Sequence, residues 1–260
     1  MMRFLAALLL FIMSTSIVTG DGLKKIEILE GWKKLDGSIV YGLKISLKEG
    51  WKTYWHTPGP MGLKPQFDFE GSLNIGSLSV LWPSPKVFGS SGFESIGYEN
   101  EVILPIKMKA KIDSDPVNLK IKGSIGICYD TCVPIEFETQ SGLKTVSKDI
   151  NTDLLAALAN LPVSPSDLGK SNARCSITFG PTGFKIEADI PYLEKTGSYV
   201  FFSIKGYRDA LSIEQPKQFK PGKIISASGD WYNKPSVKIS GDLITITQLD
   251  EGQVIEQEGC

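Results

Sequence analysis

The residues best suited to chemistry in this 260-residue chain are two cysteines, Cys128 and Cys132, in the stretch GICYDTCVPIEF (126–137). Two neighbouring thiols can form a structural disulfide, hold a soft metal ion or carry out thiol–disulfide exchange. In one extended strand the two residues would lie about 13 Å apart, whereas a disulfide needs Cα atoms within about 7 Å of each other. A bridge between them therefore requires a tight turn.

The residues around the pair predict that this turn ends a β-hairpin. β-Branched residues flank both cysteines, and Pro134 disfavours the interior of a helix. We expect a three-residue loop, Tyr129-Asp130-Thr131, between the cysteines. A bridge that closes so short a loop removes little entropy from the unfolded chain, and strained or exposed disulfides are easier to reduce. These properties favour a redox role over a structural one.

The first twenty residues predict that the protein is exported. A positive start at Arg3 precedes the apolar run FLAALLLFIM (4–13), and small and polar residues follow it. This order is typical of a cleaved signal peptide. The alternative is an N-terminal membrane anchor, but the run is shorter than the roughly 20 apolar residues that span a bilayer. We therefore expect residues 1–20 to be a signal peptide and the mature protein not to span a membrane.

Export makes disulfides the first expectation for all four cysteines. Proximity along the chain favours a bridge between Cys128 and Cys132. Cys175 opens one predicted strand and Cys260 ends the chain. The first and last strands of a sandwich can be neighbours, so Cys175 and Cys260 are a candidate disulfide, with a free thiol at Cys260 as the alternative.

The elements that must position these cysteines are predicted to be almost all strands. Apolar and polar residues alternate in segments such as 38–47, 101–110 and 117–127, with Gly, Pro and Asn between them. Residues 51–100 have no clear period, and we expect a long loop there that is functional or carries small elements of its own. The segment NTDLLAALANLP (151–162) predicts one helix, capped by Asn or Thr and ended by proline. Its leucines, Leu154, Leu155, Leu158 and Leu161, would form one apolar stripe.

These patterns predict an all-β fold class. The domain organisation that we expect is a signal peptide over 1–20, a β-sandwich over 21–148, a short helix and linker over 149–171, and a second, smaller β-sandwich-like domain over 172–260. The net charge of −1, with both signs mixed along the chain, gives no basic face for nucleic acid. The GxSxG and phosphate-loop motifs are also missing from the sequence.

The metal hypothesis depends on His56, the chain's one histidine, in KTYWHTPGP. A C-x-x-x-C pair with one distant histidine resembles the copper-site pattern of Sco-type copper chaperones, and two thiolates with an imidazole suit Cu(I). That family carries its motif on a thioredoxin-like fold, whose alternating helices are not predicted here. A histidine between aromatic residues is also more often packed than a ligand. We therefore predict no metal and no cofactor.

Four segments together resemble the N-terminal domain of DsbD-type thiol:disulfide interchange proteins, in its stand-alone or ScsB-like branch. They are WKTYWHTPGPMGLKPQFDF (51–69), LWPSP (81–85), GYENEVILPI (97–106) and ICYDTCVP (127–134). The resemblance covers about residues 30–145, which is roughly half of the chain.

The resemblance implies an immunoglobulin-like sandwich in the bacterial periplasm, with Cys128 and Cys132 as the catalytic pair. In that family a thioredoxin-like domain reduces the pair, which then reduces periplasmic partners. A cap loop with an aromatic residue shields the pair from other oxidants. The stretch 86–105 is similar to this cap, and it makes Phe88 or Phe93 the candidate shield. Core packing is the alternative for either phenylalanine.

The loop between the cysteines offers two further candidates, Tyr129 and Asp130, which could tune thiolate formation. A carboxylate so close to a thiol disfavours the thiolate. Both residues could equally be ordinary turn residues, since aspartate favours turns. We expect Cys132 to be the cysteine that links to partner proteins and Cys128 to resolve the mixed disulfide.

Two departures from the family limit what the resemblance implies. The cysteine spacing is narrower than in the best-known DsbD domain, and the membrane and thioredoxin-like domains of full DsbD are not in this sequence. We therefore expect a separate thioredoxin-like or membrane electron-donor protein, with periplasmic disulfide-containing proteins as clients. The resemblance also implies a link to cytochrome c biogenesis. The rival hypothesis is an exported, non-enzymatic binding module, such as a Cu(I) carrier that uses the cysteine pair.

Overall fold

The structure is a computed structural model that describes residues 22–59, 61–89, 93–143, 146–147, 149–193, 198–205, 217–218, 225–230, 239–250 and 253–260. The signal peptide expected over residues 1–20 lies outside these ranges. Within the described ranges, no helix is both long enough and apolar enough to cross a membrane.

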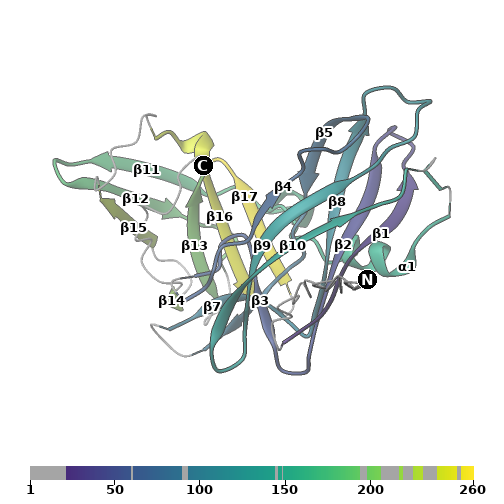
Figure 1. The fold of residues 1–260 in the computed structure, drawn as a ribbon. Helices are drawn as coiled ribbons and strands as arrows, with labels where there is room; N and C mark the ends of the chain where they lie inside the picture. Colours follow the sequence, from purple (N-terminus) through teal and green to yellow (C-terminus); the bar gives the residue numbers. More distant parts are fainter. Residues whose placement is uncertain are drawn as a thin grey trace, which may run out of the picture.

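The first half of the described chain forms two antiparallel sheets that share one apolar core (Figure 1). One sheet has the order β1 (Leu23–Lys33), β2 (Ile39–Leu47), β8 (Glu101–Ala110), β5 (Ile75–Val80). The other has the order β10 (Cys132–Gln140), β9 (Lys120–Cys128), β3 (Lys52–Tyr54), β7 (Ser95–Glu99), β6 (Lys86–Phe88), and β4 (Gln66–Asp68) also pairs with β9. Alternating apolar residues from both sheets fill the space between them.

The region 51–100, expected to be largely a loop, contains five short strands, β3 to β7. Their lengths of three to six residues are too short to show a period of two in the sequence. The expectation of small elements within this segment is therefore confirmed, and the short strands are separated by irregular stretches. This segment supplies β3, the strand beside the cysteine hairpin.

The second half of the described chain forms two more antiparallel sheets. One has the order β11 (Arg174–Phe179), β12 (Gly183–Asp189), β15 (Ile225–Asp230), and the other β14 (Lys217–Gln218), β13 (Tyr199–Ile204), β16 (Ile244–Asp250), β17 (Gln253–Glu258). This architecture confirms the predicted all-β class, an immunoglobulin-like sandwich followed by a smaller sandwich-like unit. The boundaries drawn at 148 and 172 fall between the two groups of strands and stay predictions.

The four-stranded sheet of the second unit has apolar residues on both of its faces. On β13, Val200 and Phe202 belong to the core of the second unit, whereas Phe201 belongs to the core of the first sandwich. Leu249 of β16 and Val254 of β17 also pack into the first core. One sheet therefore serves two cores, and the two units are in direct apolar contact.

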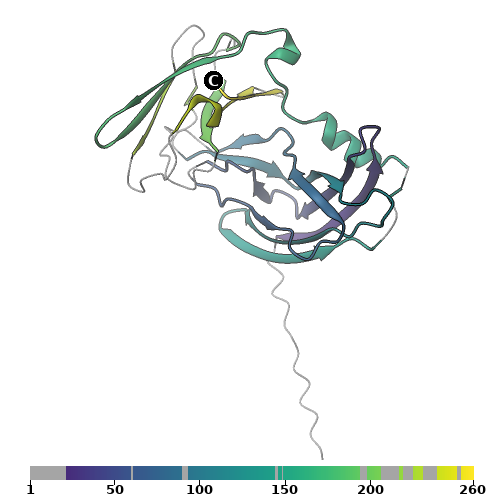
Figure 2. The same cartoon turned by 90° about the horizontal axis from the view of Figure 1, so that it is seen from above.

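The predicted helix is α1 (Thr152–Ala159), which lies against the outside of the first sandwich (Figure 2). Asn151 caps it, because its side-chain oxygen accepts a hydrogen bond from the Leu154 N–H at 3.1 Å. Leu154 is fully buried near Trp32 and Val40, but Leu155 is 47% exposed. The apolar stripe predicted for this helix is therefore narrower than expected.

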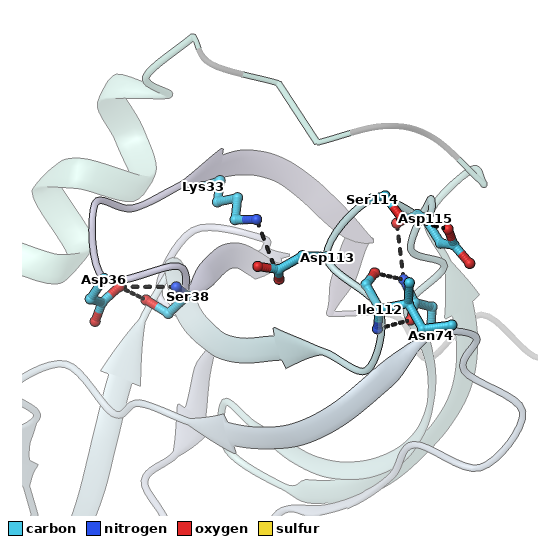
Figure 3. Close-up of polar contacts among 8 residues, drawn as sticks. All are labelled: Lys33, Asp36, Ser38, Asn74, Ile112, Asp113, Ser114 and Asp115. Atoms are coloured by element: carbon cyan, nitrogen blue, oxygen red, sulfur yellow. Dashed lines mark hydrogen bonds and ion pairs between the residues drawn. The ribbon is translucent and has the colours of Figure 1, made fainter.

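Polar contacts hold the turn between β1 and β2 and the loop between β8 and β9, as Figure 3 shows. Asn74 has a positive φ of 57°, and its amide group exchanges hydrogen bonds with the backbone of Ile112 and donates to the Asp115 carbonyl. In the turn after β1, Asp36 accepts hydrogen bonds from the backbone and side chain of Ser38. These bonds are the main cause that lowers the pKa of Asp36 to about 2. The contacts of Asn74 hold the loop between β8 and β9, and the cysteines lie at the far end of β9.

Candidate redox site at the tip of a hairpin

The two cysteines face each other at the end of a β-hairpin. Cys128 is the last residue of β9, Cys132 is the first of β10, and the sheet register pairs them directly. A disulfide joins them, with Cα atoms 4.0 Å apart. The predicted hairpin with a three-residue loop is thus confirmed. Pro134 fits because β10 lies at the edge of its sheet, where a missing N–H leaves no ladder bond unmade.

The two sulfur-bearing residues differ in their access to solvent. Cys132 is exposed, whereas Cys128 is partly buried. On its other side β9 pairs with β3, and Lys52 of β3 lies opposite Cys128. An attacking thiolate from another protein can therefore approach Cys132 more easily than Cys128.

Tyr54 of β3 is in direct contact with the disulfide. Its hydroxyl oxygen lies 3.0 Å from Cys132 Sγ, and the residue is only 4% exposed. Because a disulfide sulfur carries no proton, the tyrosine O–H is the donor. Burial raises the pKa of Tyr54, so the phenol keeps its proton at neutral pH. The site thus contains a buried hydrogen-bond donor directed at one sulfur.

The absence of a side chain at Gly126 makes room for this tyrosine. A Cβ atom there would lie 2.8 Å from Tyr54 Cε2 and 2.6 Å from Leu63 Cβ, closer than real contacts allow. The Thr53 hydroxyl donates a hydrogen bond of 2.9 Å to the Gly126 carbonyl. Gly126 therefore lets the ring of Tyr54 lie close against β9 and reach Cys132. Sequence reasoning missed Tyr54, because only the pairing of β3 with β9 places it beside the cysteines.

Tyr129 and Asp130, the predicted tuning residues, lie in the loop between the cysteines and are exposed. The ring of Tyr129 stacks on Trp51 with centroids 6.0 Å apart and lies over Gly50, whose φ is +75°. This packing orders the loop from one side. The predicted effect of Tyr129 and Asp130 on thiolate formation stays a prediction.

The two candidate shielding residues lie in different surroundings. Phe88 ends β6 and is partly buried, and its ring centroid lies 5.3 Å from Nζ of Lys52, the residue opposite Cys128. Phe93 is 65% exposed. Neither belongs to the buried core, so the alternative of core packing does not describe them. Shielding by Phe88 or Phe93 stays a prediction, with Phe88 connected to the site through Lys52.

His56, the candidate copper ligand, is packed between aromatic rings. Its ring centroid lies 3.7 Å from that of Trp55 and 5.5 Å from that of Trp82. Burial, together with the charge of Lys64, lowers the pKa of His56 to about 3. Among the described residues, no three His, Cys, Asp or Glu side chains gather where they could hold a metal ion. His56 and the two cysteines therefore do not form a three-ligand site.

A second disulfide joins Cys175 of β11 to Cys260, which are separated by 85 positions in sequence. Both residues are partly buried and pack against the core of the second unit. The backbone N–H of Cys260 also donates to the Gly241 carbonyl at 3.0 Å. This bridge ties the three-stranded sheet to the end of the chain after β17.

Comparisons with known proteins find similarity to a thiol:disulfide interchange protein, in agreement with the disulfide at the site. Residues 28–144, a little under half of the chain, match the family model for the N-terminal domain of the thiol:disulfide interchange protein DsbD. No curated protein sequence matches the chain significantly.

Two solved structures are similar to the chain to very different degrees. The N-terminal periplasmic domain of ScsB from Proteus mirabilis aligns with a TM-score of 0.60 and 21% identity, over 87% of this chain and 90% of that one. At this identity the match indicates a common fold. The YadV chaperone aligns with a TM-score of only 0.21 and 9% identity, over 89% of this chain and 97% of that one, which carries no structural information. Residues 28–144, which include the cysteine hairpin, are thus similar to the N-terminal domain of DsbD.

Proposed function

We propose that the protein carries out thiol–disulfide exchange through Cys128 and Cys132, and that it relays electrons from a thioredoxin-like donor to disulfide-containing client proteins. The observation that carries this proposal is an exposed residue, Cys132, in a disulfide at a hairpin tip, with the Tyr54 hydroxyl 3.0 Å from its sulfur. A structural bridge needs neither the exposure nor the donor.

The exchange reaction balances without a cofactor. A thiolate of the reduced donor attacks Cys132 Sγ, the Cys128–Cys132 bond breaks, and Cys128 leaves with the electron pair and takes up a proton. The donor's second thiol then attacks the donor sulfur that is bonded to Cys132 and releases Cys132. The donor has become a disulfide, and the pair has gained two electrons and one proton, with Cys128 as a thiol and Cys132 as a thiolate. The same steps in reverse reduce a client disulfide.

Tyr54 supports this chemistry at the sulfur that bonds to partners. Negative charge develops on Cys132 when it leaves the mixed disulfide, and a thiolate accepts hydrogen bonds far more strongly than a disulfide sulfur does. The buried O–H of Tyr54 therefore stabilises the reduced pair more than the oxidised pair.

The proposal includes a location and partners. A signal peptide over residues 1–20 would bring the protein to the periplasm, and the similar ScsB structure is of a periplasmic domain. There the donor would be a separate thioredoxin-like or membrane electron-donor protein, and the clients would be periplasmic disulfides, including those handled in cytochrome c biogenesis.

A trapping experiment tests the function. The oxidised protein is mixed with a thioredoxin variant that keeps only its attacking cysteine, and the released thiol is capped with an alkylating agent. We expect a mixed disulfide at Cys132 and an alkylated Cys128, located by peptide mass spectrometry. The Cys132→Ser variant is the matched control and should form none. A bridge that full thioredoxin leaves oxidised at equilibrium would overturn the proposal and leave a structural disulfide.

A further inference from the structure

We propose that the second unit is a positioning element of the redox site, because the contact between Phe201 and Trp55 holds strand β3 where Tyr54 reaches Cys132. This inference rests on the proposed function. It assigns a role to the second unit, whose own strands contain no residue of the cysteine hairpin.

Three successive residues, the last two of β3 and Trp55 directly after it, contact three different parts of the molecule. The Thr53 hydroxyl binds the Gly126 carbonyl on β9 at 2.9 Å, and the Tyr54 hydroxyl binds Cys132 Sγ on β10 at 3.0 Å. Trp55, which is fully buried, meets Phe201 of β13 edge to face with centroids 5.6 Å apart. Side chains alternate along a strand, so Tyr54 and Trp55 extend from opposite faces of it. A shift of Trp55 therefore reaches Tyr54 through the one peptide unit that joins the two residues.

At this point the backbone is hydrogen-bonded toward β7, whereas its pairing toward β9 has already ended. The Trp55 N–H donates to the Ile96 carbonyl at 2.9 Å and continues the pairing of β3 with β7. The pairing of β3 with β9, by contrast, covers only Lys52 and Thr53. Tyr54 thus pairs with Gly97 of β7 but lies just beyond the pairing with β9, and on that side its ring position depends on packing against Gly126 and on where Trp55 is held.

Other residues of the second unit also pack around Trp55. Leu249 and Val254 lie in the same apolar cluster as Trp55 and Phe201, so a surface of three strands covers this end of the first core. Phe202, the next residue on β13, turns the other way into the second unit's own core. The two neighbouring phenylalanines therefore separate the two roles of the strand, contact with the first sandwich and stability of the second unit.

The consequence for the chemistry has a definite direction. If β3 shifts when Phe201 is truncated, the hydrogen bond from Tyr54 to Cys132 lengthens. The reduced pair then loses more stabilisation than the disulfide does, because the thiolate is the better acceptor. Truncation of Phe201 should therefore move the pair toward the disulfide, in the same direction as removal of the tyrosine hydroxyl.

The test measures the equilibrium of the Cys128–Cys132 pair with dithiothreitol in the full-length protein, by alkylation and peptide mass spectrometry. We expect Tyr54→Phe to lower the fraction reduced, with roughly a tenfold change in the equilibrium constant. Phe201→Ala should give a change of about threefold or more in the same direction, and Phe201→Leu, which keeps an apolar contact, a smaller one. The double variant Tyr54→Phe/Phe201→Ala should equal Tyr54→Phe alone, because Phe201 acts through the hydroxyl.

Phe202→Ala is the matched control. It removes the same side chain from the adjacent position, so it lowers the stability of the second unit but should leave the equilibrium constant unchanged. An unchanged constant in Phe201→Ala, an equal shift in Phe202→Ala, or additive effects in the double variant would overturn the inference. If Phe201→Ala does not fold, Phe201→Leu and Trp55→Phe decide by the same comparison. The equilibrium constant with dithiothreitol can be measured even if thioredoxin cannot reduce the pair. Failure of the proposed function and failure of the inference are therefore distinguishable.

Discussion

The two disulfides of this protein connect very different parts of the chain. The Cys128–Cys132 bridge closes a separation of 4 positions at the tip of one hairpin. The Cys175–Cys260 bridge closes a separation of 85 positions and joins a three-stranded sheet to the residue that follows the last strand. The first bridge links residues that the β-ladder already holds together, whereas the second links residues far apart in sequence.

The difference teaches which bridge can be opened without loss of the fold. A disulfide stabilises a protein chiefly by restricting the unfolded chain, and the restriction grows with the length of the closed loop. The hairpin bridge contributes little in this way, and its Cys132 is an exposed residue with a hydrogen-bond donor beside its sulfur. The long-range bridge contributes more and is packed against a core. Under the proposed function, redox chemistry and structural stability therefore belong to separate pairs.

The largest expected effect is on stability. Replacing both members of the second pair, Cys175→Ser with Cys260→Ser, should lower the free energy of unfolding by about 4.5 kcal/mol, whereas Cys128→Ser with Cys132→Ser should cost about 2 kcal/mol. Urea titration of the two double variants beside the oxidised parent measures both values. Equal losses would contradict the division of roles.

The next effect is on the order of reduction. Limiting thioredoxin or dithiothreitol should open Cys128–Cys132 roughly tenfold or more faster than Cys175–Cys260, because Cys132 alone among the four cysteines is exposed. Timed alkylation followed by mass spectrometry of the two cysteine-bearing peptides gives both rates in one sample. Simultaneous opening would show that access does not separate the bridges.

A smaller effect should follow from Gly126→Ala, which acts on the hairpin pair alone. The added methyl group collides with the ring of Tyr54 and with Leu63, so the tyrosine hydroxyl must move away from Cys132. We expect a change of about fivefold in the dithiothreitol equilibrium of the hairpin pair and none at Cys175–Cys260. Gly180→Ala offers a control at an exposed glycine whose added Cβ would make only an ordinary contact, 3.6 Å from the Gly183 carbonyl oxygen. A shift at both bridges would indicate general loosening instead.

The smallest expected effect is a pH dependence of the free energy of unfolding, caused by a residue of the second unit. Burial raises the pKa of Glu256 on β17. A carboxyl whose folded-state pKa is raised contributes stability below its unfolded pKa, and that stability is lost as the pH rises through the folded value. Glu256→Gln should therefore unfold at higher urea concentration than the parent at pH 7.5, by less than about 1 kcal/mol, and show no such gain below about pH 4. Urea titrations at both pH values check the sign, and a gain at acid pH instead would contradict it.

Much of the fold could be predicted from the sequence because long strands have a visible period. The segments 38–47 and 101–110 correspond closely to β2 and β8, and the apolar stripe of 151–162 predicted α1. The five strands between residues 51 and 100 were not predicted individually, since three residues do not establish a period and β3, β4 and β5 pair with strands distant in sequence. Long-range pairing decides such strands, and a single sequence does not contain it.

The site was predicted only in part for the same reason. Cys128 and Cys132 are close in sequence, so their turn and bridge follow from local geometry. Tyr54 lies 78 positions before Cys132, and only the neighbouring positions of β3 and β10 on either side of β9 bring them together. Phe201, farther still, contacts Trp55 across the two units. Local spacing identifies the reacting atoms, whereas the groups that hold and tune them come from tertiary structure.

The sheet of β13, β16 and β17 with two buried faces has a consequence for how this protein can vary among related sequences. In an ordinary sandwich every second residue of a strand faces water and accepts polar replacements. On β13, Val200, Phe201 and Phe202 are all buried, whereas Tyr199 and Ser203 are partly buried, so three successive positions do not accept polar replacements. A saturation scan of this strand should give a continuous run of intolerant positions, and an exchange of the second unit between relatives would succeed only together with the residues around Trp55.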